Sequence, residues 1–251
     1  MKNQYVYTII IPHFNIPHLL RRCLRSIPDR TDIQIIVVDD NSPNSFKFKD
    51  NISELSRYNV EYYQTYESKG GGYVRNIGIN HAKGKYLLFA DADDFFTENL
   101  NSILDYYAEK DFDIAFFKGT SCDTDTYEIT HRADHLNKYI DLYLKGIDSN
   151  ASNLRYLFGE PWCKIIKRDV VTMYSIKYDE TKIHNDTTFA YLVGYYAKKI
   201  IVDERLLYCV TTRAGSVSVT TSDDRILTRV KVYGRAELFF MEKKLPVIMD
   251  K

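Results

Sequence analysis

The sequence predicts an α/β fold with a mostly parallel central sheet flanked by helices. Short continuous apolar runs, typical of strands that are covered on both faces, recur through the first half of the chain. Segments with a helical spacing of apolar residues separate these runs. This alternation is the βαβ pattern, in which right-handed crossovers join parallel strands. Ligands of such sheets bind beyond the carboxyl ends of the strands, so we expect the functional residues there.

The first predicted strand runs from Tyr5 to Ile11 and stops at Pro12. The helix after it has Leu20 and Leu24 on one face and arginines on the other, and Pro28 ends it. Further strands follow, separated by a cluster of turn formers and then by a run of glycines that precedes a second helix. These strands are Ile33–Val38, Val60–Gln64 and Tyr86–Ala90, with the turn formers at 39–43 and the glycines at 70–72.

The chain after the fourth strand begins with a helix for which Thr97 is the predicted N-cap. A fifth strand is expected from Ile114 to Phe117, and beyond it the pattern is less regular. The elements expected there are helices near 136–144, 153–158 and 186–196, strands at 200–202 and 206–210, and an amphipathic basic helix over 226–240.

The composition excludes several classes of protein. Lysine plus arginine and aspartate plus glutamate number 34 each, whereas a nucleic-acid-binding protein usually has a basic excess. The four cysteines form no Cys-x-x-Cys pair, so we expect neither a zinc site nor a disulfide framework, which fits a reducing cytoplasm. We also expect no secretory signal, and no run approaches the ~20 apolar residues that span a bilayer.

The fourth strand ends abruptly in three carboxylates, Asp91, Asp93 and Asp94. Burying a charge is costly unless it is paired or bound to a metal, so this run indicates a cation site. Hard oxygen ligands suit Mg²⁺ or Mn²⁺, which usually share their coordination with phosphates. The ends of the first two strands, at 12–15 and 39–42, should converge on the same crevice. The alternative is a solvated turn with an aspartate N-cap.

Four short motifs follow one another along the chain: Pro12-His13-Phe14-Asn15, Val38-Asp39-Asp40-Asn41-Ser42, Arg75-Asn76-Ile77-Gly78 and Asp91-Ala92-Asp93-Asp94. Together they resemble the family 2 glycosyltransferases, an inverting group with a GT-A fold. The third stands for the family's Arg-Asn-x-Gly, and the fourth for the Asp-x-Asp run at a strand end. A further resemblance, to the polysaccharide-assembling branch, lies in a Trp-x-Lys stretch. This further stretch is Trp162-Cys163-Lys164.

The resemblance implies that the first half binds a nucleotide sugar. Residues Pro12, Phe14 and Asn15 would line the nucleotide pocket, with the Phe14 ring near the base. The Asp40 carboxylate would accept a hydrogen bond from the uracil N3–H, which implies a UDP-sugar donor. The Arg75 guanidinium would approach the pyrophosphate.

The resemblance also implies a divalent metal, Mn²⁺ or Mg²⁺. Within the carboxylate run, Asp93 would ligate the metal, and Asp91 would hold the ribose or bind at the metal. A metal there would stabilise the negative charge that develops on the leaving diphosphate. In the segment 211–218, which resembles a basic, serine-containing loop, Arg213 would cover the same diphosphate.

On the acceptor side, the resemblance implies that Asp186 is the catalytic base. It stands in His184-Asn185-Asp186-Thr187-Thr188-Phe189, which resembles the family's Glu-Asp-x-x-Phe except that Asn185 replaces the glutamate. The base would deprotonate an acceptor hydroxyl, and a single displacement would turn an α-linked donor into a β-linkage. Trp162 would lie near the acceptor.

The resemblance assigns residues 1–118 to the nucleotide-sugar-binding half and residues 119–220 to the half of the same domain that binds the acceptor. Residues 221–251 would be a helical extension. The implied acceptor is a glycan or a lipid-linked oligosaccharide, assembled at the cytoplasmic face of a membrane. The basic segment 225–235 would then touch that surface or a partner subunit, or be a solvated helix face. The oligomeric state is left open.

Other interpretations compete with each assignment. The side chain of Asp186 would cap its own helix, Arg75 would be a solvated charge, and Trp162 would belong to the core. Asp39 or Asp40 would close an Asx turn. A calcium loop starting at Asp91 is excluded, because Phe96 and Ser102 stand where an EF-hand needs Gly and Glu. A nucleotidyltransferase would have a glycine-rich basic loop after the first strand. A non-catalytic nucleotide-sugar-binding or scaffolding protein of the same fold stays open as the alternative function.

Overall fold

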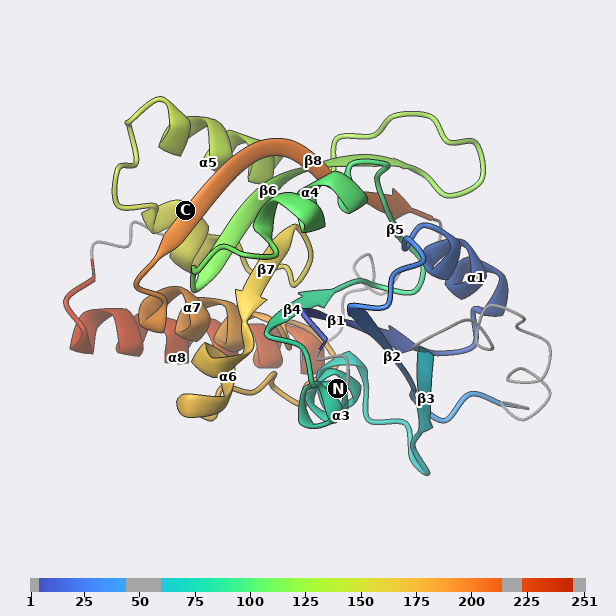
Figure 1. Cartoon of the computed structure of the whole chain (residues 1–251). Helices are drawn as coiled ribbons and strands as arrows, with labels where there is room; N and C mark the ends of the chain where they lie inside the picture. Colours follow the sequence, from blue (N-terminus) through green and yellow to red (C-terminus); the bar gives the residue numbers. More distant parts are fainter. Residues whose placement is uncertain (1–4, 44–59, 214–222, 246–251) are drawn as a thin grey trace.

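The structure, a computed structural model, describes residues 5–43, 60–213 and 223–245. In these ranges one curled sheet has the strand order β3-β2-β1-β4-β7-β6-β8-β5, with helices on its faces (Figure 1). The predicted α/β class is therefore confirmed. The strands are β1 (Tyr7–His13), β2 (Ile33–Asp39), β3 (Val60–Gln64), β4 (Tyr86–Phe89), β5 (Phe95–Phe96), β6 (Ile114–Asp123), β7 (Lys164–Lys167) and β8 (Ile200–Thr212). The helices are α1 (Pro17–Arg25), α3 (Gly71–His81), α4 (Leu100–Tyr107), α5 (Asp134–Leu144), the π-helix η2 (Asn153–Leu157), α6 (Arg168–Met173), α7 (Thr187–Tyr196) and α8 (Asp223–Glu242).

The first half of the sheet is parallel, as predicted. Strand β1 pairs in parallel with β2 on one side and β4 on the other, and β2 pairs in parallel with β3. His13 lies opposite Asp39, and Ile10 lies opposite Phe89. Strands β1, β2 and β4 therefore end at the same edge of the sheet, which brings the polar residues that follow them to one side of the molecule.

The first strand extends two residues beyond its predicted end. Pro12 pairs with Val38 inside β1, whereas the sequence pattern places the strand end before it. Proline is tolerated in a strand where its missing N–H faces no partner. The pairing of β1 with β4 ends at Ile10, so Pro12 has a neighbouring strand only on the β2 side.

The second half of the sheet is mixed. Strand β7 lies antiparallel between β4 and β6, β5 pairs antiparallel with β8, and β6 and β8 run parallel. The sequence pattern does not reveal β5, β7 or α6, because segments of two to six residues are too short to show a periodicity. Strand β8 is continuous where two strands are predicted. Its pairing with β6 skips Glu204 and Arg205, and these two charged residues interrupt the apolar pattern as a turn would.

The prediction of Thr97 as the N-cap of the third helix, α4, is wrong. The N-cap residue of α4 is Asn99, and the Thr97 hydroxyl donates instead to the carbonyl of Leu206, at 2.6 Å. The Thr97 N–H also donates to the Leu207 carbonyl, at 3.0 Å. The pairing of β5 with β8 thus takes Thr97 away from the helix, so a tertiary contact overrides the local capping preference.

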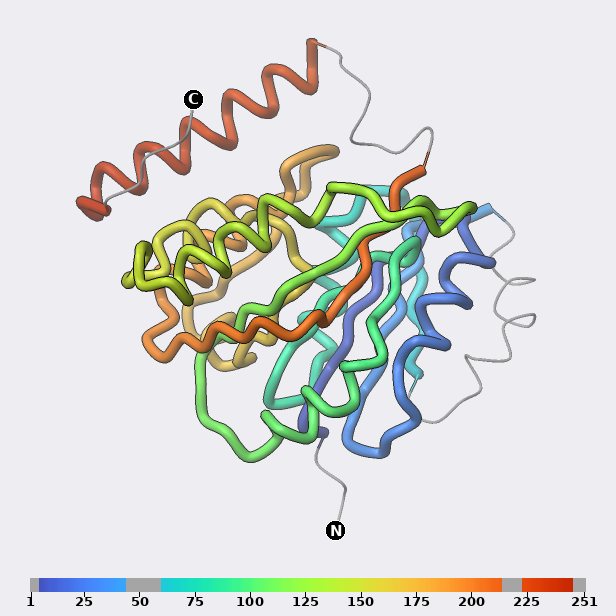
Figure 2. Tube along the Cα trace, turned by 90° about the horizontal axis from the view of Figure 1, so that it is seen from above, coloured from blue at the N-terminus to red at the C-terminus, as the bar shows by residue number. Residues whose placement is uncertain are grey.

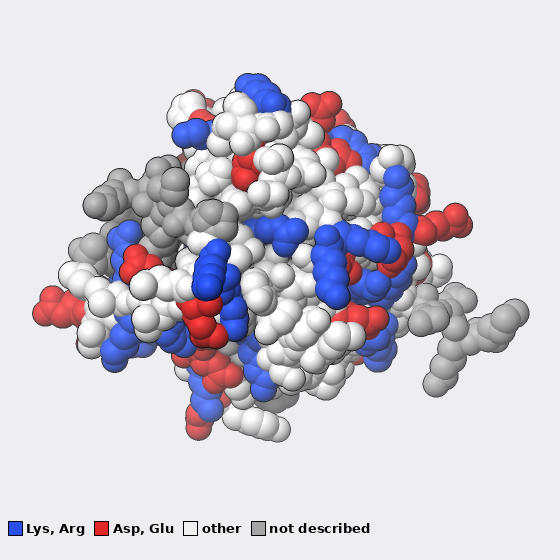
Figure 3. Space-filling view, turned by 90° about the vertical axis from the view of Figure 1, so that its left-hand side faces the viewer, with Lys and Arg blue, Asp and Glu red and all other residues white. Residues whose placement is uncertain are grey.

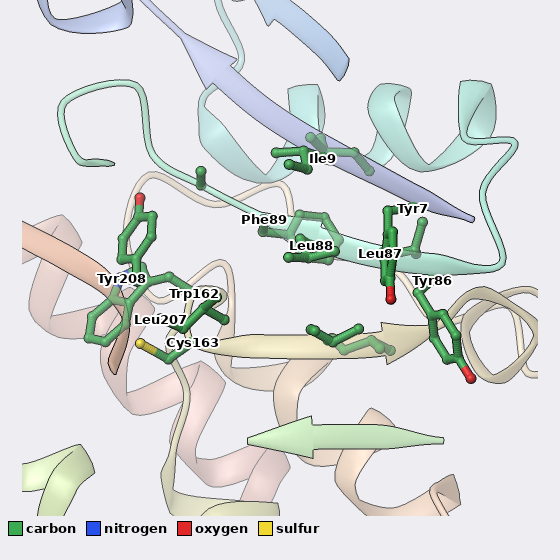
Figure 4. Packing of buried hydrophobic residues seen from close by; sticks show 14 of the residues in the cluster. Tyr7, Ile9, Tyr86, Leu87, Leu88, Phe89, Trp162, Cys163, Leu207 and Tyr208 are labelled. Carbon is green, nitrogen blue, oxygen red and sulfur yellow. The ribbon is translucent and has the colours of Figure 1, made fainter. Parts of the chain in front are cut away.

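Helix α3 packs under β1 and β2, and α5 covers β6 and β8 (Figure 1). Glycine permits the close approach of α3, because a Cβ on Gly78 would lie 2.4 Å from Cγ2 of Ile10. The same core cluster joins β4 to β8. Figure 4 shows Leu87, Leu88 and Phe89 along β4, with Trp162 and Tyr208 beyond one end of that row. This continuous core holds the strand ends and α3 in fixed relation.

The C-terminal helix α8 lies along the outside of the molecule, next to α7 (Figure 2). Its inner side packs a small cluster of Ala236 and Phe240 against Tyr191. On the face that includes α8, positive and negative side chains are interspersed (Figure 3). Within the described ranges, no helix is long and apolar enough to cross a bilayer.

Candidate active site

The carboxylate turn after β4 is held by backbone contacts to β8. The Asp91 N–H donates to the Tyr208 hydroxyl, at 2.8 Å. The Thr211 N–H donates to the Asp94 carboxylate, at 2.7 Å, and the Thr211 hydroxyl donates to the Asp93 carbonyl, at 2.8 Å. The turn is therefore fixed by a strand more than a hundred residues away, which argues against a merely solvated turn.

Negative charge is concentrated at this turn. Burial and the neighbouring Asp91 charge raise the pKa of Asp93, and burial raises the pKa of Asp94 well above its usual range, with Asp91 and Asp93 adding to the effect. Nε of Arg213 lies 3.4 Å from the Asp93 carboxylate and opposes this rise. Asp91 and Asp93 keep about a third of their side chains accessible, at 30% and 27%, so both can reach a ligand.

These two carboxylates fit a metal that arrives with a diphosphate. Within the described residues, no group of three or more His, Cys, Asp or Glu side chains suits a metal ion. Mg²⁺ and its relatives usually take one or two carboxylates and complete their octahedron with water and phosphate oxygens. Asp91 and Asp93 supply such a partial set. Burial and the repulsion from Asp91 raise the pKa of Asp93, and a bound cation would relieve that repulsion.

The end of β1 leaves an exposed aromatic ring at the same edge of the sheet. Phe14 is 50% exposed, and Asn15 follows it in the left-handed region, with φ 52°. The Asn15 N–H donates to the hydroxyl of Ser42, at 2.7 Å, and Pro12 is half-buried within β1. These contacts tie the predicted nucleotide-side residues of β1 to the end of β2.

The two aspartates that end β2 have different tasks. Asp39 closes the turn, because its carboxylate accepts hydrogen bonds from the N–H and the hydroxyl of Ser42, both at 2.7 Å. It also contacts Nδ1 of His13, at 2.6 Å. The Asp40 carboxylate instead points to the start of α3 and accepts hydrogen bonds from the Ser68 hydroxyl and from the N–H groups of residues 69 and 70. Asp39 is therefore the residue that closes the turn, although it binds Ser42 three positions on and not the N–H two positions on that defines an Asx turn. A carboxylate with about four lone-pair sites leaves Asp40 one more hydrogen bond.

Arg75 is buried and links the two sides of the site. Its guanidinium donates to the Asp91 carboxylate and, at 3.0 Å, to the amide oxygen of Asn185. It lies over the ring of Tyr178, at 5.4 Å from the centroid. Burial lowers the pKa of Arg75, but the charges of Asp91, Tyr178 and Asp186 and the hydrogen bond to Asp91 together outweigh burial and raise it. Arg75 is not a solvated helix charge.

A backbone clamp fixes the loop that carries Asn185 and Asp186. The Asn76 amide donates to the Tyr178 carbonyl and accepts from the Tyr178 N–H, at 3.0 and 2.9 Å. At the N-terminus of α3, a Cβ on Gly72 would lie 1.9 Å from the Asp179 carbonyl oxygen. Neighbouring residues of α3 thus contact both Asp91 and the loop that precedes α7.

Asp186 occupies the N-cap position of α7, but its side chain makes no capping hydrogen bond. The capping interpretation is therefore wrong for its carboxylate. Burial raises the pKa of Asp186 to about 6; Arg75 lowers it, while Glu160 and Asp91 add to the rise. A carboxylate with this pKa is ionised at neutral pH yet basic enough to accept a proton, as a general base requires.

Glu160 and Lys164 lie behind Asp186. Oε1 of Glu160 contacts Nε2 of His135 at 3.0 Å. Burial raises the pKa of Glu160, but His135, a backbone hydrogen bond and the Lys164 charge together lower it. The Lys164 ammonium donates to the carbonyls of Phe158 and Glu160, each at 2.7 Å, and burial lowers the pKa of Lys164 to about 8. Both charges act on Asp186 at the start of α7.

The acceptor-side assignment of Trp162 requires a correction. Its ring is 2% exposed and stacks on Tyr208, with centroids 6.0 Å apart, as Figure 4 shows. A ring buried in this way offers no face to a sugar. Since the Tyr208 hydroxyl accepts from the Asp91 N–H, Trp162 supports the carboxylate turn from inside the core.

Several residues of the site carry no signal in the sequence. Arg22, predicted on the exposed face of its helix, donates to the Asp93 carbonyl. Tyr208 and Thr211 stand in an ordinary apolar strand, and Tyr178 lies in a segment without a motif. The predicted loop 211–218 is described only as far as Arg213, so residues 214–218 lie outside the described residues.

Comparison with known proteins identifies the family and the fold of the chain. The sequence model described as glycosyl transferase family 2 matches residues 8–174. The glycosyltransferase GlyA of Streptococcus pneumoniae is 26% identical over 225 residues, which cover 84% of this chain and 31% of GlyA. The uncharacterized glycosyltransferase YibD of Escherichia coli is 27% identical over 221 residues, which cover 84% of this chain and 62% of YibD. The chain thus spans about a third to three fifths of the length of these relatives.

Among solved structures, S. aureus TarS in complex with UDP-GlcNAc superimposes with a TM-score of 0.64. The match has 19% sequence identity and covers 86% of this chain and 61% of TarS. At this identity the likeness concerns the fold, and it confirms the GT-A architecture that the motifs imply. Since the family model covers two thirds of its length, the chain belongs to glycosyl transferase family 2.

Proposed function

We propose that the chain transfers a sugar from a UDP-sugar to a hydroxyl group of a glycan or lipid-linked acceptor, with inversion at the anomeric carbon. Family membership and the geometry of the site, which has a donor side and an acceptor side, support the proposal. On one side the ends of β1, β2 and β4 and the start of α3 supply the groups for a nucleoside diphosphate. On the other side a base stands at the start of α7.

On the donor side, we assign Phe14, Asn15 and Pro12 to the nucleotide pocket and the remaining lone pair of Asp40 to the uracil N3–H. Arg75 and Arg213 would contact the diphosphate, where charge-assisted hydrogen bonds are strong. The UDP-GlcNAc bound to the related TarS fold supports a uridine nucleotide.

Asp91 and Asp93 would hold a divalent cation, Mn²⁺ or Mg²⁺. The cation would add positive charge where the leaving UDP becomes more negative. The chain itself contributes the fixed turn, which keeps the two carboxylates in place before the ligand arrives, and Arg75, which balances Asp91.

Asp186 would take the proton of the acceptor hydroxyl as that oxygen attacks the anomeric carbon from the face opposite to UDP. The observation that carries the proposal is the carboxylate of Asp186 itself. It makes no capping hydrogen bond, and its pKa is raised to about 6. The neighbouring Asn185 accepts a hydrogen bond from Arg75, which is paired with Asp91. A positioned base contributes about 10²–10⁴-fold to a rate.

The functional division of the chain follows from the same proposal. Residues 1–118 would bind the donor, residues 119–220 would bind the acceptor and supply the base, and residues 221–251 would extend the acceptor side. Arg225 and its neighbours up to Arg235 would face a membrane surface or a partner subunit at the cytoplasmic side of a membrane, where lipid-linked acceptors are exposed.

The test combines binding and turnover on the full chain. Melting temperature is measured with UDP, CDP, ADP and GDP, each with and without Mn²⁺, because a ligand of the folded state raises it. We expect a shift with UDP that Mn²⁺ enlarges in the wild type, and an Asp93→Asn variant that keeps the UDP shift but loses the enlargement. UDP release from UDP-GlcNAc and UDP-glucose is then measured in the wild type and in Asp186→Asn.

The outcomes separate the two candidate functions. Release of UDP that depends on Asp186 supports the transferase. A UDP shift without turnover of any UDP-sugar favours the non-catalytic nucleotide-sugar-binding alternative. No UDP shift, or a larger shift with another base, would overturn the donor assignment.

A further inference from the structure

A pocket next to Asp186 is closed on one side by the C-terminal helix. It has a volume of ≈ 250 Å³ and lies between the end of η2, Glu160, the start of α7 and α8. Pockets for drug-sized ligands have about 300–1,000 Å³, so this one has room for a single ring rather than an extended chain. Helix α8 lies beyond residues 8–174, so this wall comes from outside the part that the family model matches.

The walls of the pocket are aromatic. Tyr233 of α8 is half-buried, and its ring meets the ring of His184 edge-on, with centroids 5.2 Å apart. Tyr156 also lines the pocket and meets Phe240 edge-on, with centroids 5.5 Å apart. Aromatic rings with a polar tip suit a ligand that has apolar faces and a hydroxylated edge, as a pyranose ring has.

The polar groups of the pocket are acidic. Both Glu160 and Asp186 line it, and one oxygen of Glu160 is engaged with His135, which leaves the other to accept a hydroxyl hydrogen. The Lys164 ammonium is used by the carbonyls of Phe158 and Glu160. Arg229 is exposed and lies beside Tyr233. Two carboxylates repel a phosphate and accept hydrogen bonds from neutral hydroxyl groups.

We propose that this pocket binds an uncharged pyranose ring of the acceptor, with Tyr233 along one face of the ring and Glu160 accepting a hydrogen bond from one of its hydroxyl groups. The proposal rests on the proposed function, because it places the attacking hydroxyl beside Asp186. It narrows the acceptor to a neutral sugar and makes α8 part of the acceptor site.

The test measures transfer from a UDP-sugar to octyl β-glucopyranoside, octyl β-galactopyranoside and octyl N-acetyl-β-glucosaminide, with glycerol 3-phosphate as the anionic probe. The variants are Tyr233→Ala, Tyr233→Phe and Glu160→Gln. Leu238→Ala is the matched control, because Leu238 belongs to the same helix and is 69% exposed. We expect Tyr233→Ala and Glu160→Gln each to raise the acceptor KM by about tenfold, the equivalent of one lost anchoring contact.

Two further readouts separate acceptor binding from folding and from the donor. The UDP-induced shift in melting temperature should be the same in all variants, and Tyr233→Phe, which keeps the ring, should restore most of the acceptor affinity. Saturation-transfer NMR between the protein and the octyl glycosides reports binding without turnover. We expect this signal in the wild type and in Leu238→Ala, and its loss in Tyr233→Ala.

An unchanged acceptor KM in Tyr233→Ala and Glu160→Gln would overturn the proposal, as would a preference for glycerol 3-phosphate. UDP-sugar hydrolysis without transfer to any of the pyranosides would also count against it. If no UDP-sugar is consumed at all, the proposed function has failed. The saturation-transfer signal and its dependence on Tyr233 then still decide whether the pocket binds a neutral ring.

Discussion

The two sides of the site hold their carboxylates in opposite ways. On the strand-end side, Asp39 and Asp40 accept hydrogen bonds from backbone N–H groups, Asp39 from Ser42 and Asp40 from residues 69 and 70. On the α7 side, the Asp186 carboxylate makes no capping hydrogen bond, and Glu160 contacts the side chain of His135.

The difference separates positioning from proton transfer. Backbone donors stabilise the charged form of a carboxylate and fix its direction, which suits a frame for a ligand that is the same in every turnover. A carboxylate without such donors, in a desolvated position, keeps a higher proton affinity, which suits a base. The following predictions would sharpen this contrast or break it.

The largest effect is expected from Asp186→Asn. The transfer rate should fall by about 10²–10⁴-fold, because the amide cannot accept the proton, while UDP affinity is retained. Rates with saturating donor and the UDP-induced shift in melting temperature measure the two quantities. An equal loss of UDP binding would place Asp186 on the donor side and remove the contrast.

The same variant should also be more stable than the wild type above about pH 6. The folded-state pKa of Asp186 is raised to about 6, so between about pH 4 and 6 the folded protein holds a proton that the unfolded chain releases. The wild type therefore loses stability as the pH rises through this window, and Asn does not. Urea unfolding of both proteins at several pH values measures the gap, which should close toward about pH 4.

Asp40→Ala should destabilise the donor side. It leaves two backbone N–H groups and the Ser68 hydroxyl without their acceptor, and hydrogen bonds to a charged group contribute about 1.5–3 kcal/mol each. We expect a loss of about 3 kcal/mol in the free energy of unfolding, together with weaker UDP binding. Asp40→Asn, which keeps one acceptor oxygen, should recover part of both. Normal stability with weak UDP binding would mean that Asp40 serves only the ligand.

Asn185→Glu should shift the pH dependence of transfer. A carboxylate at this position would compete for Arg75 and add a negative charge beside Asp186, so the pKa of Asp186 should rise above about 6. The acidic limb of the kcat/KM profile should then move to higher pH by about one unit, the size of a typical single-charge effect. Asn185→Gln, which stays neutral, is the control. An unmoved limb in Asn185→Glu would show that a different group titrates.

The smallest effect is expected from Arg235→Ala, which removes the ion pair between α8 and Asp179, with 2.7 Å between Nη2 and Oδ2. Arg235 is half exposed, so we expect a change of about 1 kcal/mol or less in the free energy of unfolding. Thermal unfolding at low and high salt measures it. A large loss would show that this contact, rather than the Ala236–Phe240 cluster, holds α8 in place.

The amino-acid sequence by itself determined the parallel half of the sheet and the positions of Asp40, Asp91 and Asp93 at its strand ends. These follow from the spacing of apolar residues within one strand or helix, which is a local property. The motif containing Asp186 is local in the same sense.

Only the tertiary structure decided what these residues contact. Arg75 meets Asn185 across 110 positions and Tyr208 meets Asp91 across 117, and no local pattern records such pairs. Burial placed Trp162 in the core, and the pairing of β5 with β8 gave Thr97 a hydrogen bond to β8 rather than a capping task in its helix. A local preference is worth about 1 kcal/mol, and the packing of a whole sheet exceeds it.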